Sequence, residues 1–160
     1  MAFYEQEVDV LISEDKLQAR VRELAAEITR DYAGKDLTLI CVLKGSAFFA
    51  IDLAKYIDLP VKLEFLGVSS YQGGTESTGE VRITTDVSKP MAGKHLLVIE
   101  DIIDTGLTMQ FLLEKPARAR TKVDIDYKGF VIEDLFVVGY GLDYAEVYRN
   151  IPFIGVMKNK

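Results

Sequence analysis

Three acidic residues follow an apolar run near the middle of this 160-residue chain. Residues 96–99, Leu-Leu-Val-Ile, are typical of a parallel strand buried on both faces, and Glu100 and Asp101 come directly after them. Ligands of open α/β sheets bind outside the carboxyl ends of the strands. Because burial of unpaired charge is costly, we expect these carboxylates to contact a vicinal diol or hydrated Mg²⁺. A solvated acidic strand end is the alternative for the pair taken alone.

The third acid, Asp104, begins a turn of sequence Asp-Thr-Gly-Leu-Thr. Gly106 permits a positive φ, so successive backbone N–H groups can converge on a phosphate, and Thr105 and Thr108 add hydroxyl donors. A helix that starts directly behind the turn would add the positive end of its dipole. An ordinary helix cap is the alternative, but the turn and the acid pair together favour a phosphate site.

A second strand-to-helix turn, Lys44-Gly45-Ser46, also suits an anion because it combines a cation, a glycine and a hydroxyl at a helix start. The alternative is an ordinary connection in which Ser46 caps the helix. Two anion sites in one small domain predict a ligand with phosphoryl groups at its two ends.

The roles of three further residues stay open on the residues alone. His95, the only histidine, precedes a buried strand and is expected to be a strand residue rather than a catalyst. Phe136 could stack on a planar base or belong to the core. Asp143 could ligate Mg²⁺ through oxygen or cap a helix over residues 144–149.

Composition predicts a single globular domain, residues 1–160, with 49% hydrophobic and 28% charged residues. The formal charge of −6 argues against a nucleic-acid or anionic membrane surface. The single cysteine, Cys41, lies in an apolar run and is expected to be a buried free thiol, which fits a reducing compartment. No apolar stretch reaches the length of a membrane span, and residues 1–7 do not resemble a signal peptide, so we expect a cytoplasmic protein.

Hydrophobic periodicity alternates between strands and helices, which predicts an α/β fold with a mostly parallel sheet. A polar, glycine-rich segment inside a long hairpin predicts a mobile lid. The expected helices are a Ser13-capped helix ending at Gly34, residues 46–57, residues 109–114 and a helical turn over 143–149. The expected strands are residues 37–43, 61–68, 80–87, the segment that begins at 95, 136–138 and 153–157.

The run V-I-E-D-I-I-D-T-G-L-T, residues 98–108, resembles the signature of the type I phosphoribosyltransferases. Further blocks resemble the bacterial hypoxanthine-guanine members over nearly the whole chain: L-K-G-S-A-F-F at 43–49, S-S-Y at 69–71, Y-K-G-F at 127–130, F-V-V-G-Y-G-L-D-Y at 136–144 and Y-R-N-I-P-F-I-G-V at 148–156. The resemblance implies a central, mostly parallel sheet flanked by helices, with a small hood from the chain ends. It also implies transfer of the 5-phosphoribosyl group from phosphoribosyl diphosphate to a 6-oxopurine, with Mg²⁺ as cofactor.

The same resemblance assigns roles at the sugar and phosphate end. Glu100 and Asp101 would bind the ribose hydroxyls and, with Asp143, the metal. Asp104 would also be the base that takes a purine proton. The 5′-phosphate would be held by Asp104, Thr105, Gly106, Leu107 and Thr108. Pyrophosphate would be held by Lys44, Gly45 and Arg149, with a cis peptide between Leu43 and Lys44.

At the purine end, the resemblance assigns Lys115 to the purine O6 and Phe136 to stacking on the ring. The full set of purine-binding residues would be Ile103, Lys115, Phe136, Val137 and Asp143. The lid that closes over the reaction would contain Ser69, Ser70 and Tyr71.

One feature departs from the family pattern. In the family, a full helix and a further parallel strand, which ends in the purine-binding lysine, follow the phosphate turn, whereas here Asp104 and Lys115 are eleven positions apart. A parallel crossover needs a dozen or more residues, so residues 109–114 are too few. We expect that a helix–strand segment is missing near residues 113–115, either by deletion or because the sequence omits part of a longer chain.

Three functions fit this sequence. The first is a purine-salvage enzyme that converts hypoxanthine, guanine or both to IMP or GMP and pyrophosphate. The second is a non-catalytic regulator of the same fold that binds phosphoribosyl diphosphate or a nucleotide, and the third is a transferase for another base. Asp104, the lid and Arg149 favour an enzyme, because a sensor needs no proton transfer. A homodimer or homotetramer is expected, with no nucleic-acid or membrane partner.

Overall fold

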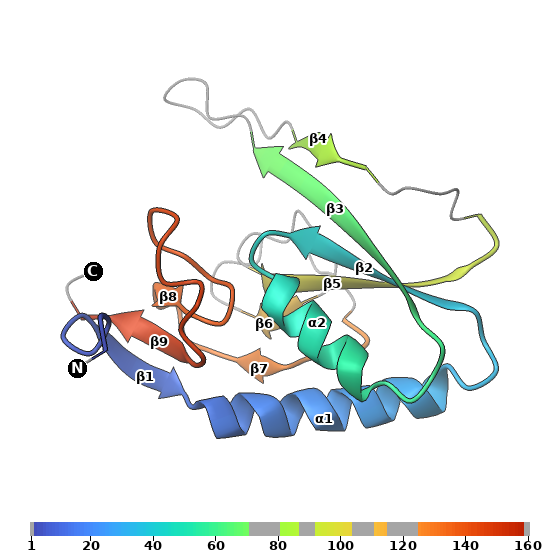
Figure 1. Cartoon of the computed structure of the whole chain (residues 1–160), viewed down its shortest axis with the longest axis horizontal. Helices are drawn as coiled ribbons and strands as arrows, with labels where there is room; N and C mark the ends of the chain where they lie inside the picture. Colours follow the sequence, from blue (N-terminus) through green and yellow to red (C-terminus); the bar gives the residue numbers. More distant parts are fainter. Residues whose placement is uncertain (1, 71–80, 87–91, 104–110, 115–124, 159–160) are drawn as a thin grey trace.

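The computed structural model describes residues 2–70, 81–86, 92–103, 111–114 and 125–158. A six-stranded sheet of order β4-β3-β2-β5-β6-β7 forms its centre (Figure 1). Neighbouring strands are parallel except for the β3–β4 pair. The predicted α/β fold with a mostly parallel sheet is therefore confirmed. The strands of this sheet are β2 (Leu37–Leu43), β3 (Lys62–Ser70), β4 (Val81–Thr85), β5 (His95–Ile103), β6 (Phe111–Glu114) and β7 (Phe130–Val131).

Two helices cover one face of the sheet. Helix α1 (Glu14–Asp31) begins after Ser13, whose side chain accepts a hydrogen bond from the Lys16 backbone nitrogen at 3.4 Å. Helix α2 (Ala47–Tyr56) packs against α1 and β2. Both helices share one apolar core with Cys41, a buried free thiol as predicted. The buried face of α1 repeats at helical spacing: Leu17, Val21, Leu24, Ala25 and Ile28.

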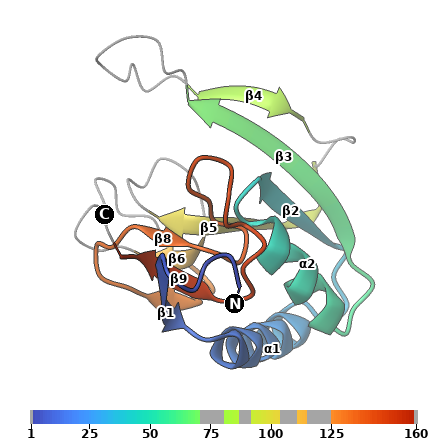
Figure 2. The ribbon, with the colours of Figure 1, turned by 60° about the vertical axis from the view of Figure 1, so that its left-hand side comes forward.

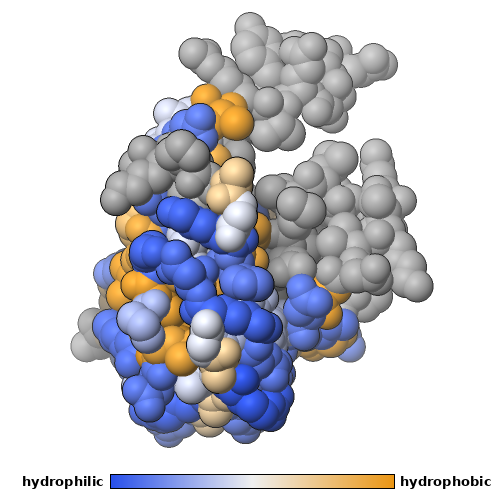
Figure 3. Space-filling view, turned by 90° about the vertical axis from the view of Figure 1, so that its right-hand side faces the viewer, coloured by the Kyte–Doolittle hydropathy of each residue, from blue (hydrophilic) through white to orange (hydrophobic). Residues whose placement is uncertain are grey.

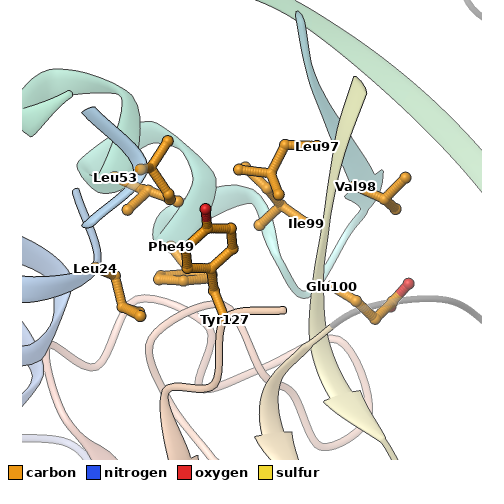
Figure 4. Close-up of a pocket in the computed structure, with 9 residues that line it drawn as sticks. Leu24, Phe49, Leu53, Leu97, Val98, Ile99, Glu100 and Tyr127 are labelled. Atoms are coloured by element: carbon orange, nitrogen blue, oxygen red, sulfur yellow. The ribbon is translucent and has the colours of Figure 1, made fainter. Parts of the chain in front are cut away.

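Strand β5 separates the helical core from the opposite face of the sheet. Figure 4 shows Leu97 and Ile99 directed toward the helices, while Val98 and Glu100 point to the other side, as strand alternation requires. The core side encloses a cavity of about 20 Å³, which has room for about one water molecule. Most of its lining is apolar: Leu24, Ile28, Phe49, Leu53, Leu97, Val98, Ile99, Glu100 and Tyr127. The cavity is therefore a packing gap rather than a binding site.

Strands β3 and β4 form the predicted antiparallel hairpin, with register from Gly67 opposite Thr85 to Ser70 opposite Val81. The hairpin projects past the ends of β2 and β5 (Figures 1 and 2). Two of the predicted lid residues, Ser69 and Ser70, end β3. The third, Tyr71, lies outside the described residues.

A second, three-stranded sheet joins the two ends of the chain. Its order is β1-β9-β8, formed by Val8–Ile12, Ile154–Met157 and Val137–Val138, with antiparallel neighbours. It lies beyond the carboxyl ends of β2 and β5 in Figures 1 and 2. This sheet is the predicted hood, which is therefore confirmed, although β1 itself was not predicted.

The helix predicted over residues 109–114 is wrong where the structure describes the segment. Residues 111–114 are strand β6, parallel to β5, with Glu100 opposite Phe111 and Ile103 opposite Glu114. A run of four residues is too short for a stable helix, whereas pairing with β5 and β7 satisfies its backbone groups. A strand thus ends directly before Lys115, where one was expected to be missing, and residues 104–110 connect it to β5.

The helical turn predicted over residues 143–149 is also wrong. Ala145, Glu146 and Tyr148 have φ angles of 51°, 65° and 75°, which right-handed helices do not contain. Tyr144 and Val147 instead form an antiparallel bridge. We refer to residues 139–149 as the hood loop, and it connects β8 to the segment before β9.

The face at the amino ends of β2 and β5 is mainly hydrophilic, with apolar side chains in small separate groups (Figure 3). In the part of the chain that the structure describes, none of the helices has the length and apolar character needed to span a membrane. The chemistry-bearing residues lie at the opposite, carboxyl ends of the strands.

Candidate active site

Gly45 lies in close contact with both an acidic strand end and the hood loop. A Cβ atom added at Gly45 would lie 1.5 Å from Asp101 Oδ2, and one added at Gly141 would lie 2.0 Å from the Gly45 carbonyl oxygen. Only residues without a side chain fit at both positions, and Gly141 also needs its φ of 102°. The backbone after β2 therefore touches Asp101 on one side and the hood on the other.

The loop that contains Gly45 has an unusual backbone conformation and is fixed by a buried serine. The Leu43–Lys44 peptide is cis, as the family resemblance predicts. Ser46 does not cap α2 with its side chain, so the simple capping alternative is wrong. Its buried hydroxyl donates instead to the Val42 carbonyl oxygen at 2.6 Å and lies 3.2 Å from Cys41 Sγ. This contact ties the start of α2 to the end of β2.

Two cationic side chains converge on this loop. Lys44 Nζ lies 2.9 Å from Glu146 Oε2, and Arg149 lies 3.5 Å from the other oxygen of Glu146. Arg149 also donates to the Gly141 carbonyl oxygen at 2.8 Å. The structure thus brings together Lys44, Gly45 and Arg149, the three residues predicted for pyrophosphate, and shows a carboxylate paired with both cations.

The acid pair has unusual proton affinity. Burial, followed by the adjacent charge of Asp101, raises the pKa of Glu100 to about 9. Burial also raises the pKa of Asp101, although its Oδ1 accepts a hydrogen bond from the Ile102 backbone nitrogen at 2.8 Å. Glu100 Oε2 is buried without a hydrogen-bond partner among the residues that the structure describes. Such an acceptor fits a ligand that supplies a hydroxyl donor or a cation.

The predicted metal ligands are Asp143 in the hood loop and the pair Glu100 and Asp101 in β5. Asp143 contacts Arg149 at 2.7 Å through Oδ1 and accepts the Glu146 backbone N–H at 2.9 Å through Oδ2. Among the residues that the structure describes, no three His, Cys, Asp or Glu side chains gather in a metal-binding arrangement. Glu100 and Asp101 alone still fit Mg²⁺, which keeps several waters and usually takes its other ligands from substrate phosphates.

The purine-binding predictions fall at several places in the fold. Phe136 is 45% exposed and forms a T-shaped pair with the Tyr144 ring, with centroids 5.8 Å apart, so its ring is accessible for stacking. Val137 is buried in β8, and Ile103 ends β5. Asp104 to Thr108 and Lys115 lie outside the described residues.

Sequence reasoning missed Glu146, Tyr140 and the tight contact at Gly141. A signal was present in the motif Gly-Tyr-Gly at 139–141, since two glycines around one residue are typical of an unusual backbone. The three φ angles are 94°, 51° and 102°, all in the left-handed region. This conformation lets the hood loop approach Gly45.

Comparison with known families finds that the model of the phosphoribosyl transferase domain matches residues 12–114. A hypoxanthine-guanine phosphoribosyltransferase of Staphylococcus aureus is 45% identical over 167 residues, covering 94% of this chain and 93% of that protein. The bifunctional protein TilS/HprT of Listeria monocytogenes is 46% identical over 93% of this chain. The chain spans only 26% of the length of that Listeria protein.

A crystal structure of a hypoxanthine phosphoribosyltransferase from Staphylococcus aureus superimposes with a TM-score of 0.92 at 43% identity. That comparison covers 98% of this chain and 95% of the other. In the 167-position sequence alignment, 94% of this 160-residue chain supplies about 150 residues. About 17 aligned positions of the relative therefore have no counterpart here.

Proposed function

The chain belongs to the phosphoribosyltransferase family, and from this membership we propose that it is a purine-salvage enzyme. It transfers the 5-phosphoribosyl group from phosphoribosyl diphosphate to N9 of hypoxanthine or guanine. The products are IMP or GMP and pyrophosphate. The 45% identity with a relative that bears this name, over most of both chains, supports the substrate class.

One observation in this structure supports the proposal most directly: Gly45 lies between Asp101 and Gly141. That contact places the loop with two nearby cations directly beside the acid pair at the carboxyl ends of β2 and β5. A ligand with ribose hydroxyls close to a diphosphate needs this combination, because the diphosphate leaves from C1 of the same ribose.

The reaction breaks the bond between C1 and the diphosphate oxygen and leaves an oxocarbenium-like sugar. Lys44 and Arg149 stabilise the negative charge that develops on the departing diphosphate. Glu100 and Asp101 orient the ribose hydroxyls and hold Mg²⁺, which when bound neutralises part of the diphosphate charge. Asp104 takes the purine proton, and Lys115 stabilises negative charge on O6.

Substrate binding requires an exchange of partners at the cationic end of the site. The Lys44–Glu146 pair has side chains that are 67% and 68% exposed. Exposed pairs of this kind are worth about 0–1 kcal/mol, so a diphosphate with several charges displaces Glu146 readily. Glu146 keeps the two cations near Gly45 until the substrate arrives.

The proposal includes a cytoplasmic location and a homodimer or homotetramer. Cys41 is a buried free thiol, which fits a reducing compartment. The oligomeric state rests on the family resemblance and is checked by light scattering on the purified chain.

The proposed function is tested with purified protein whose mass has been confirmed. Product formation from phosphoribosyl diphosphate is followed by chromatography with hypoxanthine, guanine, xanthine or adenine, in Mg²⁺ and in excess chelator. We expect IMP and GMP in Mg²⁺, little AMP, and no product in chelator. Tight binding of phosphoribosyl diphosphate without any nucleotide product would instead support a non-catalytic regulator.

A further inference from the structure

Tyr140 has a buried hydroxyl that the proposed chemistry does not use. The residue is 4% exposed and packs in the main apolar core, yet its φ of 51° is unusual for a bulky side chain. Its hydroxyl donates to Asp52 Oδ2 at 2.9 Å. Phenylalanine would bury the same ring without placing a polar group in the core, so packing alone does not explain the hydroxyl.

Asp52 is the point where three segments meet. Gln18 of α1 donates to Asp52 Oδ2 at 2.9 Å, and Lys55 lies 3.0 Å from Asp52 Oδ1. Burial opposes ionisation of Asp52, but the three hydrogen bonds together keep its pKa below the ordinary value. Asp52 therefore stays charged at neutral pH and joins α1, α2 and the hood loop.

The position of Tyr140 in the hood loop links this contact to the active site. The next residue, Gly141, is the one that touches Gly45, and its backbone nitrogen donates to the Arg149 carbonyl oxygen at 2.9 Å. The Tyr140 backbone nitrogen donates to the Ile151 carbonyl oxygen at 2.8 Å. A shift of Tyr140 would therefore move both Gly141 and Arg149.

Asp52 lies on the helix that begins directly after the Gly45 loop. The Tyr140–Asp52 hydrogen bond thus connects the hood loop to the same rigid element that positions Lys44 and Gly45. The Phe48 and Tyr140 rings also make a tilted contact, with centroids 6.4 Å apart, and Phe48 belongs to the first turn of α2. The two walls of the diphosphate site are connected by this contact and the hydrogen bond.

We infer that Tyr140 and Asp52 are positioning residues that hold Gly141 and Arg149 against the Lys44–Gly45 loop and so set affinity for the diphosphate. This inference rests on the proposed function, since it assigns the diphosphate to that loop. The chemical class of the ligand is a diphosphate, either free or as part of phosphoribosyl diphosphate.

The test compares Tyr140→Phe with Tyr56→Phe. The control removes a tyrosine hydroxyl that accepts from Arg22 at 3.1 Å near the other end of α2. Calorimetry measures the affinity of each protein for pyrophosphate with Mg²⁺, and steady-state kinetics measures KM for phosphoribosyl diphosphate and for hypoxanthine. We expect Tyr140→Phe to weaken pyrophosphate binding and raise KM for phosphoribosyl diphosphate by about three- to tenfold, as loss of one hydrogen bond implies. The hypoxanthine KM and the control should change less than twofold.

Equal changes in both KM values, or unchanged pyrophosphate affinity in a folded Tyr140→Phe protein, would overturn the inference. Asp52→Asn provides a second variant, because the amide oxygen can still accept from Tyr140, while the charge and the acceptor for Lys55 are lost. It should retain more pyrophosphate affinity than Asp52→Ala, and equal losses in the two would also overturn the inference. If the parent protein binds pyrophosphate but forms no nucleotide, the proposed function fails while the binding comparison still decides the role of Tyr140.

Discussion

Replacement of Gly45 by alanine tests the central contact of the site. The added Cβ would lie 1.5 Å from Asp101 Oδ2 and 2.6 Å from its Cγ. The loop cannot simply move away from Asp101, because the Gly45 carbonyl already touches Gly141 on the other side. Either the Lys44–Gly45 loop or the Asp101 side chain must therefore shift.

The size of that shift follows from the geometry. Cβ atoms essentially never lie closer than 3.0 Å to a non-bonded heavy atom of another residue, so the two groups must separate by roughly 1.5 Å. A displacement of about 1 Å in a catalytic group can cost about 100-fold in rate. We expect kcat/KM for phosphoribosyl diphosphate to fall by at least about 100-fold in Gly45→Ala.

The assay is steady-state kinetics with varied phosphoribosyl diphosphate at saturating hypoxanthine, on proteins shown to be folded by circular dichroism. Gly34→Ala is the matched control, since a Cβ at Gly34 would meet no atom of the described residues within 4 Å although its φ is 75°. It should lose stability through backbone strain but keep kcat/KM within about twofold.

The reasoning is refuted if folded Gly45→Ala keeps kcat/KM within threefold of the parent. A double-mutant cycle with Asp101→Ala identifies the cause. If the clash with Asp101 is responsible, the combined loss must be smaller than the product of the single losses, because removal of the carboxylate relieves the contact. If the loss in the double variant equals the product of the two single losses, the clash with Asp101 is not the cause.

Three further predictions concern the acids and the purine lysine. The pKa of Glu100 is about 9 in the folded protein and ordinarily 4.5, so between these pH values the folded protein binds more protons than the unfolded chain. The free energy of unfolding should therefore decline as pH rises from 5 to 9. Urea titrations should show a smaller decline in Glu100→Gln. Asp104→Ala should cut turnover by about 10² to 10⁴ while phosphoribosyl diphosphate binding persists, and unchanged turnover would remove it from the role of base. Lys115→Ala should lower kcat/KM for hypoxanthine by about ten- to a hundredfold, and a decrease of less than threefold would argue against a contact with O6.

The parts of the fold that could be predicted are those with a strong local pattern. The apolar run of β2 and the run at residues 96–99, which Glu100 and Asp101 follow within β5, indicate buried parallel strands whose carboxyl ends meet a ligand. Ser13 followed by acidic residues locates the start of α1, and the polarity between β3 and β4 locates the hairpin. In each case one segment contains the whole signal.

The errors lie where distant segments decide the local structure. Residues 111–114 become a strand because β5 and β7 supply partners on both sides. Asp143 as a possible cap favours a helical turn over residues 143–149, but Arg149 donates to the Gly141 carbonyl oxygen and pairs with Asp143. These contacts close a non-helical loop whose Gly141 approaches Gly45, and the sequence of residues 143–149 does not show this contact with a distant segment.

The missing aligned positions are expected to affect the two ends of the substrate unequally. The loop after β2 and the hood, which provide Lys44, Gly45 and Arg149, are present in full in this structure. Between β5 and β6, only residues 104–110 join two parallel neighbours, fewer than a helical crossover requires. That connection includes Asp104 to Thr108, which are predicted to hold the 5′-phosphate, and β6 then leads to Lys115, the predicted purine-binding lysine. A connection shortened at this place would leave the diphosphate end unchanged and affect the predicted 5′-phosphate and purine ends, so we expect selectivity among bases to differ from that of the longer relatives.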